Sequence, residues 1–184
     1  MRESGRITVT LVLGGVRSGK SRWAQELAQK AGRVAYFATA QALDDEMSRK
    51  IRRHQEDRPG HWKTVEEPLE LAQALSANAA GHDILLVDCL TLFVSNLLHA
   101  EESAPGSMAE RIESLMEVLR HPPASIVLVS NEVGSGVVPV YALGRQFRDA
   151  LGELNQRIAA VADDVVLLVA GLPLALKGSC GARP

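Results

Sequence analysis

The residues with the clearest chemical signature lie near the start of the chain, where Gly14-Gly15-Val16-Arg17-Ser18-Gly19-Lys20-Ser21 fits the pattern G-x-x-x-x-G-K-[ST]. This pattern binds phosphate when it joins a strand to a helix. Its glycines let backbone N–H groups approach phosphate oxygens, and the helix N-terminus adds partial positive charge. We expect Lys20 to contact the β- and γ-phosphates and Ser21 Oγ to ligate Mg²⁺. The alternative is an ordinary glycine-rich turn that matches by chance.

A carboxylate at the end of another apolar run could complete such a site. Asp88 ends the run Asp83–Asp88, and ligands of parallel α/β sheets bind beyond the C-terminal ends of the strands. Asp88 is therefore expected beside the phosphate loop, where it would help to organise Mg²⁺. The alternative is that Asp88 only caps the helix that follows. Asp83 begins the same run and is expected at the opposite end of the sheet.

The segment 44–58 is unusually charged, with acidic residues first and basic residues last, an order that suits a helix dipole. Its apolar stripe is narrow, and His54 lies near the end of that stripe. One interpretation is a solvated surface helix with a C-terminal histidine. The other is a cationic face over bound phosphates, in which neighbouring arginines lower the pKa of His54 and leave a neutral imidazole that can attack phosphorus.

A third polar run, Ser130–Pro139, follows an apolar strand and so belongs to the same sheet edge. Glu132 in this run could act as a base or organise a substrate hydroxyl, or it could simply face solvent. On the next helix, Arg145 and Asp149 lie one turn apart and are spaced to pair at the surface.

The remaining histidines and the cysteines carry weaker signals. Cys89 is expected to be a small core residue. The histidines outside the charged segment do not have the spacing of metal ligands, so a zinc site is not expected. They are His61, His82, His99 and His121.

Short β-branched runs alternate with amphipathic stretches along the whole chain, which predicts a mostly parallel α/β sheet with helices on both faces. The predicted strands are Val9–Leu13, Val34–Ala38, Ile84–Asp88, Ile126–Ser130 and Val165–Ala170. The predicted helices are Lys20–Lys30, Asp44–His54, Leu69–Ala79, Thr91–Leu98, Met108–Leu119 and Leu143–Val161.

Length and composition limit the classes of protein that remain. The 184 residues predict a single nucleotide-binding domain over 1–184, with flexible tails at 1–6 and 178–184. A net charge of −2 and few aromatic residues argue against nucleic-acid binding. The longest apolar runs are too short to span a membrane, and two cysteines do not make a disulfide framework, so we expect a cytoplasmic protein without integral membrane contact.

Several of these motifs together resemble one family closely, the bifunctional adenosylcobinamide kinase / adenosylcobinamide-phosphate guanylyltransferases of cobalamin biosynthesis. The phosphate loop alone is generic, whereas the late motifs are far more specific. The matching stretches are 14–21, Tyr36–Ala40, Asp44–Met47, Arg52–Gln55, Arg58-Pro59, Trp62–Glu66, Asn131–Pro139 and Arg145–Asp149, with Gly152 and Asn155.

The resemblance implies a P-loop NTPase fold with a RecA-like sheet and two successive reactions. ATP or GTP would phosphorylate the aminopropanol hydroxyl of adenosylcobinamide, and GTP would then transfer GMP to that phosphate through a guanylylated histidine, for which His54 is the match. It also implies a homo-oligomer, expected to be a trimer. The nucleotide contacts that it implies are Gly14, Gly15, Val16, Arg17, Ser18, Gly19, Lys20, Ser21, Ala38, Thr39, Ala40, Gln55, Glu56, Asp57, Arg58, Glu66 and Asp88.

Two other functions stay open at this point. A P-loop kinase of another small metabolite would transfer only the γ-phosphoryl group and would form no covalent GMP adduct. A nucleotide-dependent nucleic-acid-binding protein would use the basic residues 49–58 as its footprint, although interleaved acidic residues argue against it.

Overall fold

The computed structural model describes residues 6–41, 49 and 59–179. The strands are β1 (Val9–Gly14), β2 (Val34–Ala38), β3 (Lys63–Glu66), β4 (Ile84–Asp88), β5 (Ser125–Asn131), β6 (Asp164–Val169) and β7 (Leu172–Lys177). The described helices are α1 (Lys20–Gln29), α3 (Leu71–Asn78), α4 (Leu90–Glu101), α5 (Ser107–Arg120) and α6 (Ala142–Val161).

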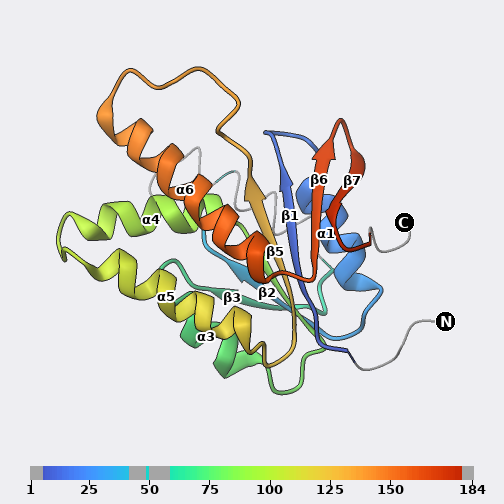
Figure 1. Cartoon of the computed structure of the whole chain (residues 1–184). Coiled ribbons are helices and arrows are strands. Elements are labelled where there is room, and N and C mark those ends of the chain that lie inside the picture. The colour runs from blue at the N-terminus through green and yellow to red at the C-terminus, as the bar shows by residue number, and fades with distance from the viewer. Residues whose placement is uncertain (1–5, 42–48, 50–58, 180–184) are drawn as a thin grey trace.

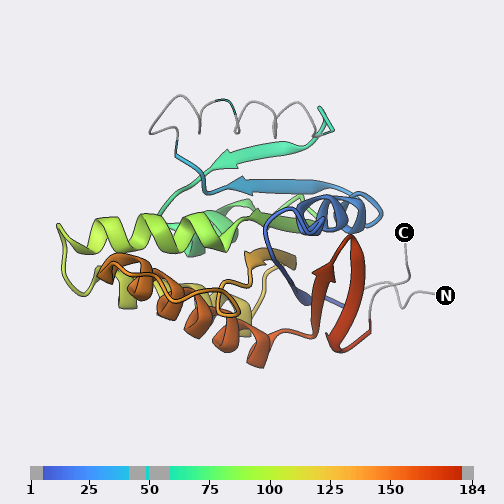
Figure 2. The ribbon, with the colours of Figure 1, turned by 90° about the horizontal axis from the view of Figure 1, so that it is seen from above.

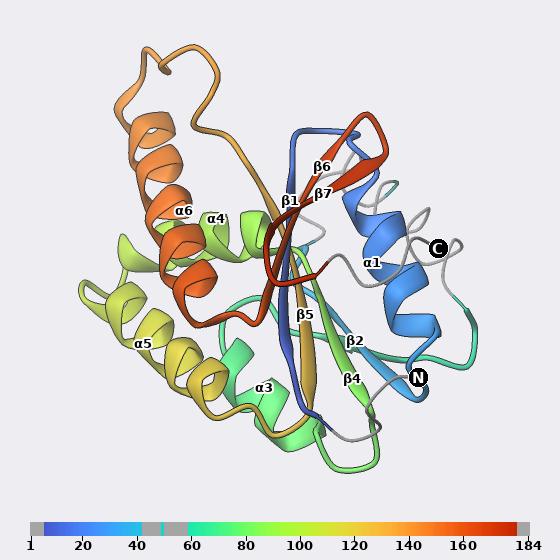
Figure 3. The ribbon, with the colours of Figure 1, turned by 45° about the vertical axis from the view of Figure 1, so that its right-hand side comes forward.

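The seven strands found in the described residues form one sheet in the order β3-β2-β4-β5-β1-β6-β7. Every neighbouring pair is parallel except β6 and β7, which form an antiparallel hairpin. Helices cover both faces, with α3, α4, α5 and α6 on one side and α1 on the other (Figures 1 and 3). This mostly parallel sheet flanked by helices confirms the predicted α/β class.

The central strands are apolar throughout because each of their faces packs against helices. In β1, Leu11 and Leu13 point into the core that contains α3, α4, α5 and α6, whereas Val12 points into the core beside Trp23 of α1. Leu11 and Val12 are fully buried, and burying such a side chain contributes about 1.5–3 kcal/mol. The alternation of side chains along β1 thus ties both helical layers to the strand that carries the phosphate loop.

The five strands predicted from apolar runs are present; β2 and β4 have the predicted bounds, and the ends of the other three differ by at most one residue. The sequence patterns did not predict β3 and β7, the two edge strands. β3 has four residues and only one partly buried side chain, and β7 is mostly exposed and contains Pro173. Neither has the continuous apolar run that marks a strand buried on both faces.

Some helix ends also differ from the predicted bounds. The helix predicted from Leu69 begins at Leu71, because Glu67 Oε1 accepts the N–H groups of Leu69 and Glu70 in a tight turn. The helix predicted from Thr91 to Leu98 runs on to Glu101. The helix predicted at Asp44–His54 lies outside the described residues apart from Arg49, which is helical.

Residues near both chain ends make contacts within the described structure. Arg6, predicted to lie in a flexible tail, pairs with Asp163 at 2.8 Å, and the Ser179 N–H donates to Asp164 Oδ1. In the part of the chain that the structure describes, no helix has both the length and the apolar character needed to cross a membrane.

Candidate active site

The motif 14–21 forms a strand–loop–helix, as predicted. Gly14 is the last residue of β1, and α1 begins at Lys20. The loop turns sharply, with left-handed backbone at Arg17 (φ 56°) and Gly19 (φ 93°) and a hydrogen bond from Ser18 N to Gly15 O. No side chain among the described residues caps the N-terminus of α1, so its first N–H groups face the loop as an anion-binding end.

Two loop glycines are required by close packing. A Cβ on Gly14 would lie 2.8 Å from the carbonyl oxygen of Leu168, and one on Gly19 would lie 3.3 Å from the Cα of Gly171. Gly171 belongs to the turn between β6 and β7, and its N–H donates to Ser18 O at 2.9 Å. The β6–β7 hairpin therefore supports the phosphate loop from the side away from β5 (Figure 2).

Lys20 is held at the loop by a hydrogen bond from its Nζ to Gly15 O at 3.1 Å. Burial lowers the pKa of the Lys20 ammonium from its ordinary value, and the nearby Cys89 and Asp88 act in the opposite direction. The ammonium thus lies among the elements that would surround a triphosphate, where an anionic ligand would offset its desolvation.

Asp88 lies directly beside the phosphate loop, as predicted. Ser21 Oγ donates to Asp88 Oδ1 at 3.3 Å, and the Tyr36 hydroxyl donates to Asp88 Oδ2 at 3.0 Å. The interpretation of Asp88 as a helix cap fails, because Cys89 is the N-cap residue of α4 and no side chain of the described residues caps that helix.

The oxygens of Ser21 and Asp88 fit Mg²⁺. In nucleotide sites this ion takes one or two protein oxygens and completes its octahedron with water and phosphate oxygens. A hydroxyl and a carboxylate at the mouth of a phosphate loop match that requirement. Among the described residues there is no cluster of three or more His, Cys, Asp or Glu that could hold a metal ion by itself.

The strand ends expected to contact nucleotide lie at the same edge of the sheet. Ala38 pairs in register with both Asp88 and Glu66. Thr39 is fully buried, and its hydroxyl donates to Cys89 O and accepts the Cys89 N–H, so it fastens the end of β2 to the start of α4. Ala40 follows it, partly buried.

The end of β5 completes this edge. Asn131 pairs in register with Gly14, and the Glu132 N–H donates to Gly14 O. The Glu132 carboxylate is exposed and accepts the N–H of Gly134, so the described geometry places it in a local turn. Asn155 is buried and donates from its side chain to Asn131 O, which connects α6 to the end of β5.

Other expectations from the sequence have mixed outcomes. His54, Gln55, Glu56, Asp57 and Arg58 lie outside the described residues.

The Arg145–Asp149 pair is not formed. Arg145 donates to the carbonyl oxygens of Pro139 and Val140, and Asp149 pairs with Arg148 at 3.0 Å. The reason is that the loop before α6 folds back over Arg145 and offers it carbonyl oxygens.

Cys89 packs partly buried against the core, as expected, and burial raises the pKa of its thiol. As expected, Asp83 lies at the opposite sheet end, and the structure adds that it pairs with Arg33 there.

Sequence reasoning missed two supports of the site, Tyr36 and Gly171. Tyr36 belongs to one of the matching family motifs, but no role was predicted for it. A tyrosine within a strand buried on both faces needs a hydrogen-bond partner, and the neighbouring strand ends in Asp88, which provides one. Gly171 follows a predicted strand, and no local pattern signals its contact with the phosphate loop.

A protein-family model described as "Cobinamide kinase / cobinamide phosphate guanyltransferase" matches residues 10–176. The chain belongs to this family. Its members are enzymes of cobalamin biosynthesis, so the predicted enzyme class and pathway are confirmed. The match supports both activities and does not support the alternative of a kinase for another small metabolite.

Two curated relatives are similar in sequence to this chain over nearly their whole lengths. The chain is 50% identical over 169 residues to the bifunctional adenosylcobalamin biosynthesis protein CobP of Pseudomonas aeruginosa, covering 91% of this chain and 96% of the relative. It is 43% identical over 178 residues to the bifunctional adenosylcobalamin biosynthesis protein CobU of Salmonella typhimurium, covering 91% and 98%.

A solved structure of a prototypical ATPase from the type III secretion system of pathogenic bacteria superposes with a TM-score of 0.57 at 11% identity. The match covers 91% of this chain and 56% of the ATPase chain. At that identity the likeness shows the fold alone, and it agrees with a P-loop nucleotide-binding sheet.

Proposed function

We propose that this family enzyme works in two steps on adenosylcobinamide. In the first, the aminopropanol hydroxyl attacks the γ-phosphorus of ATP or GTP, and a nucleoside diphosphate leaves. In the second, a ring nitrogen of His54 attacks the α-phosphorus of GTP and pyrophosphate leaves. An oxygen of adenosylcobinamide phosphate then attacks the same phosphorus, which frees His54 and yields adenosylcobinamide-GDP.

One observation carries this proposal. In a chain whose residues 10–176 match the family model, Lys20, Ser21 and Asp88 converge on one phosphate loop. Lys20 would neutralise charge on the transferred group, and the N-terminus of α1 would bind phosphate oxygens through its N–H groups.

Ser21 and Asp88 would hold Mg²⁺, with Tyr36 orienting the carboxylate. The ion, when bound, would offset negative charge on the triphosphate. We also infer that the strand ends Ala38–Ala40, together with Glu66 and the segment Gln55–Arg58, contact the guanine nucleotide.

Three broader features belong to the same proposal. Residues 1–184 would form one nucleotide-binding domain, the enzyme would act in the cytoplasm, and it would assemble as a homotrimer. Exposed leucines at positions 172, 174 and 176 on the edge strand β7 support assembly, because exposed apolar groups along a strand favour contact with another surface.

Labelled GTP tests the covalent step. Wild-type protein incubated with α-labelled GTP and Mg²⁺ should acquire acid-labile, base-stable label, and His54→Ala should acquire none. His54→Ala should keep most of its kinase activity, whereas Lys20→Ala should lose both activities by about 100-fold or more, because phosphate positioning fails.

The kinase assay on the same samples separates the two steps. If His54→Ala loses kinase activity and labelling equally, His54 serves general nucleotide binding. If the wild-type protein takes up no label while it phosphorylates adenosylcobinamide, the guanylyl-histidine step is wrong.

A further inference from the structure

A cavity of about 450 Å³ lies between α4 and the first turns of α6, apart from the phosphate loop itself. The residues of α4 that line it recur every three or four positions and so share one helix face. The described lining residues are Gln41, Thr91, Leu92, Ser95, Asn96, Leu98, His99, Glu102, Tyr141, Leu143, Gly144 and Phe147.

The chemistry of the walls suits a ligand without negative charge, since Glu102 is among the lining residues. Leucine and aromatic side chains provide apolar surface, and Gln41, Ser95 and Asn96 add amide and hydroxyl groups. None of the described lining residues is Lys or Arg, whereas the phosphate loop carries Lys20 and the N-terminus of a helix. A triphosphate is therefore expected at the loop, and an organic group that lacks negative charge and combines apolar and amide surface is expected in the cavity.

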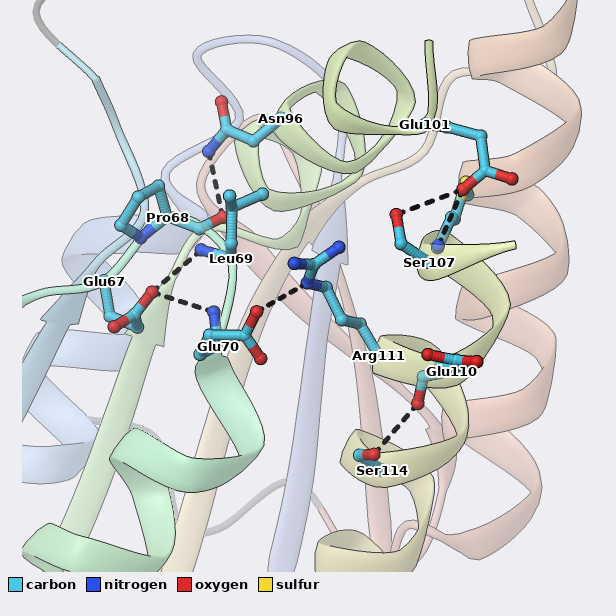
Figure 4. A network of polar contacts seen from close by, with 11 residues as sticks. Glu67, Pro68, Leu69, Glu70, Asn96, Glu101, Ser107, Glu110, Arg111 and Ser114 are labelled. Carbon is cyan, nitrogen blue, oxygen red and sulfur yellow. Dashed lines mark hydrogen bonds and ion pairs between the residues drawn. The ribbon is translucent and has the colours of Figure 1, made fainter. Parts of the chain in front are cut away.

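Hydrogen bonds join the cavity wall to the nucleotide site. Asn96 Nδ2 donates to Thr39 O at 2.7 Å. It also donates to Pro68 O at 3.2 Å (Figure 4). The Asn131 N–H donates to Thr91 Oγ1 at 3.0 Å, and Asn131 pairs in register with Gly14 of the phosphate loop. The α4 face that lines the cavity thus begins at the strand ends that surround the phosphates.

The rim of the cavity extends its apolar surface. The loop that leads into α6 rises beyond the start of that helix (Figures 1 and 3). Four of its apolar side chains are exposed, namely Val137, Val138, Val140 and Tyr141, and Leu143 continues the series into the cavity lining. A ligand too large for the cavity would therefore meet further apolar surface where it leaves the opening.

We propose that this cavity and its rim bind the corrinoid part of the acceptor substrate, with the aminopropanol arm directed toward the phosphate loop. The inference rests on the proposed function. A corrinoid presents methyl groups and primary amides around a large ring, which matches the wall chemistry and an opening with an apolar extension. Thr91 lines the cavity and accepts the N–H of Asn131, which pairs with Gly14, so these two residues connect the proposed acceptor site to the phosphate loop.

Ser95→Trp tests the proposal, because Ser95 is exposed on α4 and lines the cavity. The indole should occupy space that the corrinoid needs and raise the KM for adenosylcobinamide at least about tenfold, while the KM for the nucleotide stays within about twofold. Ser114→Trp is the matched control, since Ser114 is an exposed serine on α5 outside the cavity. It should leave both constants unchanged.

A second measurement does not depend on the tolerance of the fold for tryptophan. In Ser95→Cys, adenosylcobinamide should slow the reaction of the new thiol with a maleimide, read by peptide mass spectrometry, and GTP should not. Ser114→Cys should react at the same rate with or without adenosylcobinamide.

An unchanged acceptor KM in Ser95→Trp together with no protection of Ser95→Cys would overturn the proposal. Protection by GTP instead would assign the cavity to the nucleotide and overturn it as well. Failure of the wild-type protein to phosphorylate adenosylcobinamide would instead contradict the proposed function.

Discussion

At the scale of single residues, Gly15 and Gly19 of the phosphate loop differ in whether the structure has room for a side chain. Gly19 has a φ of 93° and lies against Gly171, whereas a Cβ on Gly15 would meet nothing within 4 Å. Gly19→Ala should therefore destabilise the nucleotide-free protein by about 1–2 kcal/mol, because it combines left-handed backbone with a tight contact.

Gly15→Ala is the matched control for this prediction and should change the free energy of unfolding by less than about 0.5 kcal/mol. Urea unfolding of both variants without nucleotide provides the measurement. If both variants lose the same free energy of unfolding, the contact between the phosphate loop and the β6–β7 turn does not contribute to stability.

At the scale of elements, the start of α5 depends on a side chain from the end of α4. Glu101 accepts hydrogen bonds from Gly106 N, Ser107 Oγ and Met108 N (Figure 4 shows Glu101 and Ser107). These backbone donors hold the pKa of the Glu101 carboxyl below its usual value of 4.5. The carboxylate thus takes the role that an N-cap side chain usually plays, since Gly106 at the N-cap has none.

Glu101→Gln should lower the melting temperature at neutral pH. The folded-state pKa is depressed, so the stabilisation is complete above the unfolded-state pKa and is lost as pH falls through the folded-state value. The difference in melting temperature between wild type and variant should accordingly shrink as pH decreases below about 4. Glu102→Gln is the control, and thermal scans from pH 3 to 7 provide the test. A difference that is constant with pH would contradict the role of the charge.

Sequence patterns predicted the central strands and the phosphate loop because both depend on short-range information. A continuous apolar run identifies a strand buried on both faces, and the glycine spacing identifies the loop. The same patterns placed Asp88 correctly, since strand polarity decides which end of a parallel strand meets the ligand.

The features that sequence patterns did not predict depend on contacts between distant segments. β7 is an exposed edge strand paired with β6, and its leucines alternate with other residues instead of forming the continuous apolar run from which strands were predicted. The cavity between α4 and α6 depends on how two helices pack, which no local pattern encodes. Arg145 similarly binds carbonyl oxygens of a loop instead of the carboxylate one turn away.

At the scale of the whole molecule, the proposed trimer predicts a hydrodynamic mass three times that of the 19.8 kDa chain. Sedimentation velocity over a 100-fold range of protein concentration would measure it. A single species of 19.8 kDa throughout that range would contradict the trimer and leave the exposed leucines of β7 as an uncovered edge.

The central position of β1 has a consequence for how the protein is made. Its neighbours are β5 and β6, and backbone N–H groups at its start bind side chains 117 and 154 residues later in the chain. At about 5–20 residues per second, a ribosome would release Gly14–Ser21 roughly 8–30 seconds before β6 is complete. During that interval β1 has two open edges, so we expect this apolar strand to be prone to aggregation in the newborn polypeptide.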